Sequence, residues 1–150
     1  MPQSLARLHV QLVFSTKHRE RILTDGGRPA LPAYMATGLQ NFGGPPLLIN
    51  SVADHVHILF ELGRTVAVSA AVEEVKTTSS KWIKTQGAEF AAFAWQAGYG
   101  AFSVSESNVA VVRDYIANQA EHHRIASFQE EYRAFLAKHG VTFDERYVWD

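Results

Sequence analysis

The chain contains no cysteine, which excludes a disulfide framework, a thiolate zinc site and a cysteine nucleophile. No apolar run reaches the ~18 residues of a membrane-spanning helix. Residues 1–6 also lack the charged start and apolar core of a secretion signal. We therefore expect a cytoplasmic protein with no membrane partner, and the absence of disulfides agrees with that reducing compartment.

A strong net charge is also missing. Fourteen Lys and Arg residues face fifteen Asp and Glu residues, which gives a net charge of −1. Residues 128–150 contribute −2 of this, so residues 1–127 carry +1. Because a protein that binds a polyanion by charge alone is far more basic, a polyanion would have to be bound by local groups of residues.

Two common catalytic motifs are absent as well. The chain has no glycine-rich phosphate loop followed by Lys-Ser or Lys-Thr, so we expect no nucleotide cofactor. It has no Gly-x-Ser-x-Gly turn, which disfavours a serine hydrolase. Its 150 residues, 47% hydrophobic and 19% charged, are typical of one globular domain, residues 1–150.

The hydrophobic pattern predicts an α+β fold. Alternation of apolar and polar residues indicates strands, and apolar residues three or four apart indicate helices. The predicted strands are 8–14, 47–52, 55–62 and the aromatic stretch 91–104, either two strands or a bent one. The predicted helices are 29–41, 68–85, one from Ser105 or Ser107 to about His122 or His123, and one from the capping box Ser127–Glu130 to Gly140. This order is typical of the ferredoxin-like split βαβ fold, an antiparallel sheet with helices on one face, plus additional C-terminal helices.

A histidine pair is the sharpest local feature of the sequence. His55 and His57 follow Asp54 on a predicted strand, where residues two apart share one face, ~6–7 Å from each other along the strand. Two imidazoles on one face can bind the same metal ion. The alternative is a pair of solvated histidines. His55 and His57, like His9 and Gln11, are expected on the face of the sheet that no helix covers, where side chains would be exposed to solvent.

A tyrosine and a glutamine form the second feature. Tyr115 and Gln119 are four residues apart, so on a helix they lie on one face. Tyr115 borders an apolar stripe, which makes ordinary packing the alternative. A phenol with its free pKa of ~10 is a weak nucleophile, but a divalent cation beside the electrophile compensates for this.

Two clusters of basic and hydroxyl residues are candidate phosphate contacts. Lys76, Ser80 and Lys81 lie in a predicted helix, and Lys17, Arg19 and Arg21 lie in a polar stretch after the first strand. Such side chains position a nucleic acid without reading its sequence. The alternatives are the solvated face of an amphipathic helix and a basic loop.

Together these segments resemble the single-tyrosine HUH transposases of small bacterial insertion sequences. HUH stands for His-hydrophobe-His. Residues 54–59 resemble the central strand motif of that family, and residues 112–119 its nucleophile helix. Residues 8–21, 76–82 and 95–104 are similar to its first strand and basic loop, its Lys-x-x-Ser-Ser-Arg/Lys-Trp helix and its Trp-x-x-Gly-Tyr strand. The segments occur in the family's order across most of residues 8–122.

The resemblance implies a metal-dependent homodimer that cuts and rejoins single-stranded DNA at hairpin-bearing ends through a 5′-phosphotyrosine. It implies that Tyr115 is the nucleophile and that Mg²⁺ or Mn²⁺ is bound by His55, His57 and Gln119. Lys17, Arg19, Arg21, Lys76, Ser80 and Lys81 would contact DNA.

Two other hypotheses remain at this point. A domesticated relative would bind hairpin DNA as a regulator without transposition. A metal-dependent phosphoesterase would use the histidines on small molecules, and Tyr115 would then be buried or point away from both imidazoles.

Overall fold

The computed structural model describes residues 2–23, 30–119 and 127–150. Four strands form one antiparallel sheet in the order β2-β3-β1-β4. The strands are β1 (His9–Ser15), β2 (Pro46–Ser51), β3 (His55–Glu61) and β4 (Gly100–Val104). In the central pair, Val13 of β1 lies opposite His57 and Ser15 lies opposite His55. The register therefore places both histidines at one end of the two central strands.

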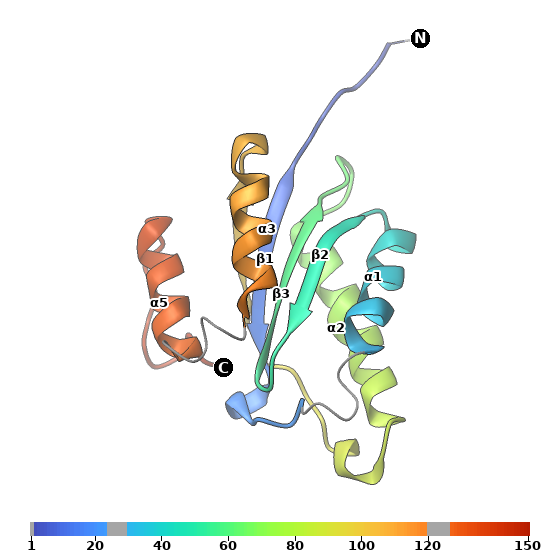
Figure 1. The fold of residues 1–150 in the computed structure, drawn as a ribbon, viewed down its shortest axis with the longest axis vertical. Helices are drawn as coiled ribbons and strands as arrows, with labels where there is room; N and C mark the ends of the chain where they lie inside the picture. Colours follow the sequence, from blue (N-terminus) through green and yellow to red (C-terminus); the bar gives the residue numbers. More distant parts are fainter. Residues whose placement is uncertain (1, 24–29, 120–126) are drawn as a thin grey trace.

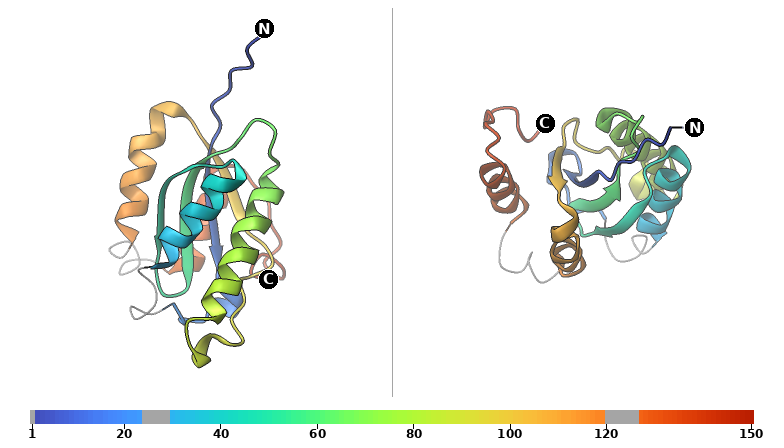
Figure 2. Two further views of the ribbon diagram at one scale, coloured as in Figure 1. Left: turned by 90° about the vertical axis from the view of Figure 1, so that its right-hand side faces the viewer. Right: turned by 90° about the horizontal axis from the view of Figure 1, so that it is seen from above.

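Helices cover both faces of the sheet. Within the described ranges they are α1 (Ala30–Phe42), α2 (Val68–Lys84), α3 (Val109–Ala117) and α5 (Phe128–Lys138). α1 and α2 pack against each other on one face, whereas α3 and α5 lie on the other (Figures 1 and 2). No helix among the described residues has the length and apolar character needed to cross a membrane.

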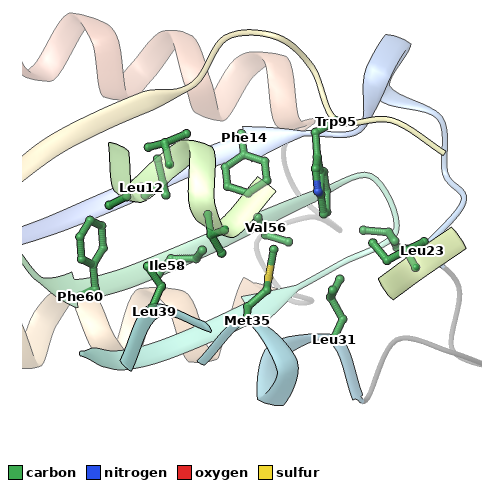
Figure 3. Close-up of a cluster of buried hydrophobic side chains, with 14 of the residues drawn as sticks. Leu12, Phe14, Leu23, Leu31, Met35, Leu39, Val56, Ile58, Phe60 and Trp95 are labelled. Carbon is green, nitrogen blue, oxygen red and sulfur yellow. The ribbon is translucent and has the colours of Figure 1, made fainter. Parts of the chain in front are cut away.

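The larger hydrophobic core lies between the sheet and the α1–α2 pair. Alternate residues of β1 and β3, including Leu12 and Ile58, point into it and are fully buried. Figure 3 shows them facing Met35 and Leu39 of α1. The ring of Trp95 packs edge-on against Phe14, 4.9 Å between centroids. This core uses one face of each strand. The intervening residues, including Val13 and His57, are also fully buried, on the opposite face of the sheet.

A second core fills the opposite face of the sheet and holds α5 there. Val13 and Phe102 of the sheet pack with Phe128, Tyr132 and Leu136 of α5. The predicted α+β antiparallel fold with additional C-terminal helices is confirmed. The expectation that the histidine face carries no helix is wrong, because the apolar stripes of α3 and α5 need a surface to cover and this face supplies it.

Two local expectations are corrected. Residues 91–95 do not form a strand; Ala88–Phe90 is a 3₁₀ turn, and only Trp95 pairs, with Thr16 as an isolated bridge. The helix expected from Ser105 or Ser107 begins instead at Val109, after a 3₁₀ turn, and neither serine caps it. Its expected end at 122 or 123 falls outside the described residues.

The last predicted helix matches the structure at both ends. The Oγ of Ser127 accepts a hydrogen bond from the backbone N–H of Glu130, at 3.2 Å. The helix is followed by Gly140 with φ +65°, a left-handed conformation that glycine adopts without a steric penalty.

Candidate metal and nucleophile site

The histidine pair lies in the interior, beneath α3 and α5. His55 and His57 are each 0% exposed, and their ring centroids are 5.2 Å apart. Phe128 of α5 covers His55, with 4.6 Å between the ring centroids. The alternative of two solvated histidines is therefore excluded.

His55 is oriented by the residue before it. Its Nδ1–H donates to the Oδ1 of Asp54 at 2.7 Å, which leaves the Nε2 lone pair on the opposite side of the ring, 3.8 Å from the Oε1 of Glu131. A carboxylate behind a histidine in this way commonly fixes the ring for metal binding. Burial lowers the pKa of His55, although the hydrogen bond to Asp54 acts in the opposite direction. The neutral imidazole, which is the form that binds a metal, is thus favoured.

His57 contacts α5 directly. Its Nε2 donates to the Oε1 of Glu131 at 2.6 Å, while its buried Nδ1 has no hydrogen-bond partner in the described part of the chain. Burial favours the neutral form of Glu131, but the hydrogen bond from His57 outweighs this effect and lowers the pKa of Glu131. The ligand atoms of the two histidines and Glu131 all lie within 4.8 Å of one another, so these three side chains could hold one cation.

Tyr115 lies beside this pair in the same chain. Its ring is edge-on to His57, 5.9 Å between centroids, and contacts Phe135 of α5 at 5.6 Å. Burial raises the pKa of Tyr115, and a hydrogen bond with Glu131 raises it further. The hydroxyl is therefore protonated at neutral pH and needs activation before it can act as a nucleophile.

Gln119 reaches the same place from just beyond α3. That helix ends at Ala117, and Asn118 leaves the helical conformation. Gln119 is nevertheless fully buried, and its side-chain N–H₂ donates to the carbonyl oxygen of Tyr115 at 3.3 Å. Its Oε1 is buried and has no hydrogen-bond partner among the residues that the structure describes. A buried amide oxygen in that state is suited to a cation.

An open cavity of about 470 Å³ lies beside Tyr115, between α3, α5 and the sheet. Its lining includes Gln11, Glu131, Phe135 and Lys138. Tyr115 is only half-buried and lines this cavity, so part of its side chain can be reached from the outside.

Glu131 is the site residue that sequence analysis missed. It is 74 residues away from His57 in the chain, and no spacing rule connects the two. One signal was available: Glu131 lies between Phe128 and Tyr132, within the apolar stripe of a helix. A carboxylate at a buried helix position requires a partner.

The predicted basic loop lies at the edge of the site. Lys17–Arg19 is a 3₁₀ turn directly after β1, and the preceding Thr16 donates its backbone N–H to the carbonyl of Asp54 at 2.8 Å. Arg19 has φ +56° and its guanidinium lies over the ring of Trp149 at 5.6 Å. Lys17 and Arg21 are exposed. These side chains are thus attached to the end of the sheet that carries the histidines.

The basic helix lies elsewhere. Ser80 and Lys81 belong to α2, on the sheet face opposite the histidines (Figure 1). The ammonium of Lys76 donates to the carbonyl oxygens of Gln96, Ala97 and Gly98 at 2.7, 3.2 and 2.7 Å. All three of its protons are used, so this geometry assigns Lys76 to holding the chain before β4 rather than to a phosphate.

Replacing Lys76 with methionine should therefore destabilise the protein. The variant keeps the apolar stem but removes the charged donor from three carbonyls, and we expect a loss of about 2 kcal/mol in the free energy of unfolding. Urea denaturation measures this loss. Lys81→Met, on the exposed side of the same helix, should change stability by less than about 0.5 kcal/mol. Equal stabilities of the two variants would contradict the structural role of Lys76.

Comparisons with known proteins identify the family. The family model described as "Transposase IS200 like" matches residues 4–119. A search of curated proteins found no match. A solved structure described as a candidate transposase from Deinococcus radiodurans R1 is similar with 21% identity and a TM-score of 0.62, covering 79% of this chain and 98% of the other. A REP-associated tyrosine transposase bound to a REP hairpin is similar with 12% identity and a TM-score of 0.59, covering 82% of this chain and 73% of the other.

At these identities the two structures are similar in fold alone. The family match, in contrast, spans more than half of the chain and includes both histidines, Tyr115 and Gln119. The chain therefore belongs to the IS200-like transposase family.

Proposed function

We propose that this protein cuts and rejoins single-stranded DNA at hairpin-bearing ends through a 5′-phosphotyrosine on Tyr115. The observation that carries the proposal is the position of Tyr115, half-buried and 5.9 Å from His57 of the same chain between ring centroids. The phenol ring thus lies next to one imidazole of the pair and lines the cavity beside it. A tyrosine with a packing role alone would not be expected to lie both beside a buried histidine pair and at the wall of an open cavity.

The residues of the site fit a divalent cation, Mg²⁺ or Mn²⁺. His55 and His57 would supply nitrogen ligands, and the buried Oε1 of Gln119 has no other partner within residues 2–23, 30–119 and 127–150. Imidazole together with oxygen ligands suits Mn²⁺, and the oxygens suit Mg²⁺. When bound, such a cation withdraws charge from a phosphate oxygen and so makes the phosphorus more open to attack.

Tyr115 performs the covalent step. Its hydroxyl oxygen attacks the scissile phosphorus, so a bond from Oη to phosphorus forms and the bond to the 3′-oxygen breaks. The proton lost by the phenol is balanced by the proton gained by the leaving 3′-oxygen, which becomes a free 3′-hydroxyl. The phosphotyrosine retains the diester energy, so the 3′-hydroxyl of another strand can reverse the step without ATP.

The proposed substrate is hairpin-bearing single-stranded DNA. One protein of similar fold is bound to a REP hairpin. Lys17, Arg19 and Arg21 offer positive charge at the site end of the sheet, whereas Ser80 and Lys81 could contact DNA only on the other face. We also propose that the protein works as a homodimer, as its resemblance to the family implies.

The direct test is the covalent intermediate itself. Purified protein is incubated with Mn²⁺ and a labelled single-stranded oligonucleotide that carries a hairpin, and denaturing electrophoresis detects an adduct. We expect a labelled band at the mass of protein plus the 3′-side DNA fragment, and its loss on chelation of the metal. No adduct with any hairpin oligonucleotide tested, including those from the DNA flanking the gene, contradicts the proposal.

The phosphoesterase hypothesis is weakened by the same geometry. It requires Tyr115 to be buried or to point away from both imidazoles. Instead Tyr115 lines the cavity and contacts His57, which supports a tyrosine that takes part in the chemistry.

We expect each Tyr115 to act with the histidines of its own chain. α3 packs on β2 and β3, and the side chain of Asn50 donates to the carbonyl of Ile116 at 2.8 Å, which fixes Tyr115 beside His57. Mixing inactive Tyr115→Phe and His57→Ala proteins should therefore restore no adduct. Recovery of adduct in the mixture, above the level of either variant alone, would show instead that the tyrosine serves a partner subunit.

A further inference from the structure

We propose that Glu131 of α5 is a direct ligand of the cation, so that this helix completes the metal centre. The inference rests on the proposed metal-dependent function. It adds a residue that lies outside the family match, which ends at residue 119. The three side chains involved, His55, His57 and Glu131, come from β3 and α5.

The distances between the three ligand atoms are close to those expected around a bound cation, so the side chains would move little when the cation binds. The Oε1 of Glu131 is 2.6 Å from the Nε2 of His57 and 3.8 Å from the Nε2 of His55. Neighbouring ligands of an octahedral cation with bonds of ~2.1 Å lie about 3 Å apart, between these two values. One oxygen therefore already faces both imidazole nitrogens.

The charge of Glu131 also favours a ligand role. Two neutral imidazoles and an amide bring no negative charge to a divalent cation, whereas a carboxylate is the ligand that Mg²⁺ and Mn²⁺ prefer. Glu131 is only 7% exposed, and the ion pairs it makes within the described residues are with the two histidines. A buried carboxylate directed at two metal-binding groups is well explained by a cation between them.

Packing holds Glu131 in this place independently of its charge. Phe128, Tyr132 and Leu136 anchor α5 in the second core. Phe128, Glu131 and Phe135 follow at helical spacing on an adjoining stripe, where the two phenylalanines contact His55 and His57 respectively. The stripe toward the histidines thus presents its carboxylate between two aromatic rings.

Binding of Mn²⁺ to the full chain tests the inference, measured by isothermal titration and by the electron paramagnetic resonance of free Mn²⁺. Loss of a residue that merely orients a ligand weakens metal binding by about 10–100-fold, so Glu131→Gln should weaken it at least as much. Glu131→Asp, which keeps the carboxylate, should recover part of the affinity. Glu130→Gln, an exposed neighbour on the same helix, should leave the affinity unchanged.

The outcomes separate this inference from the proposed function. Unchanged or tighter Mn²⁺ binding by Glu131→Gln, with the fold intact by circular dichroism, overturns the ligand role; tighter binding would mean that Glu131 competes with the cation for His57. If the wild-type protein binds no Mn²⁺ at millimolar concentration, the ligand role and the proposed metal centre both fail. Weaker binding in Glu131→Gln that Glu131→Asp partly restores supports the ligand role.

Discussion

Replacing Tyr115 with phenylalanine should abolish the covalent protein–DNA adduct and leave the fold and DNA binding in place. The variant lacks only the hydroxyl, so no oxygen remains to attack the phosphorus. Removal of a catalytic nucleophile costs about 10⁴-fold or more in rate. The lost hydrogen bond to Glu131 should cost only about 1 kcal/mol of stability. Denaturing electrophoresis with the hairpin oligonucleotide measures the adduct, and a gel-shift assay measures binding.

Tyr147→Phe is the matched control for this variant. Tyr147 is 64% exposed near the C-terminal end of the chain and should form adduct at the wild-type level. If Tyr115→Phe still forms the adduct, another residue is the nucleophile and the assignment is wrong. If the wild type binds hairpins without ever forming an adduct, the protein is a hairpin-binding regulator.

Replacing His57 with alanine should remove both Mn²⁺ binding and DNA cleavage. Cations at such sites contribute several kcal/mol to the stabilisation of the transition state, so loss of a ligand should slow cleavage by about 10³-fold or more. His57 is fully buried and paired with Glu131. The variant should therefore also lose about 3 kcal/mol of stability, because it leaves a buried carboxylate without this partner. Titration with Mn²⁺ and the adduct assay, both below the melting temperature, measure the two losses.

His9→Ala is the control variant, because it removes a buried histidine that is not part of the proposed metal site. His9 is 6% exposed on β1, on the same sheet face as His57, and pairs with Glu106 at 3.3 Å. We expect it to lose stability and to retain Mn²⁺ binding and cleavage. Cleavage by His57→Ala at the wild-type rate would contradict a metal centre at this pair.

Much of the fold could be predicted because the pattern of each element is local. Leu8, Val10, Leu12 and Phe14 alternate with His9, Gln11 and Val13, and this pattern forms a strand where it finds a partner strand. The error at 91–95 has a tertiary cause. Phe93 and Trp95 have the composition of a strand, but their rings pack edge-on, 4.8 Å between centroids, in the first core. Burial of two large rings outweighs the strand preference of the segment.

The candidate site was predicted in part, for a related reason. His55, His57 and Tyr115 occur in motifs whose residues are close in sequence, so their chemistry could be inferred from spacing. The sequence around Lys76 is the same whether its ammonium binds a phosphate or the three carbonyl oxygens 20–22 residues away. Only its surroundings distinguish the two, and the sequence does not give them.

The amino-acid sequence alone determined the order of strands and helices, the histidine pair on one strand face and a tyrosine on a late helix, because each depends on residues within a few positions. Tertiary structure decided that this face is covered and that Tyr115 and Glu131 lie beside His57 of the same chain. The reason is physical. Which apolar stripe packs on which sheet face is decided by the burial of whole elements against one another. The packing of α5 in the second core places Glu131 beside His57.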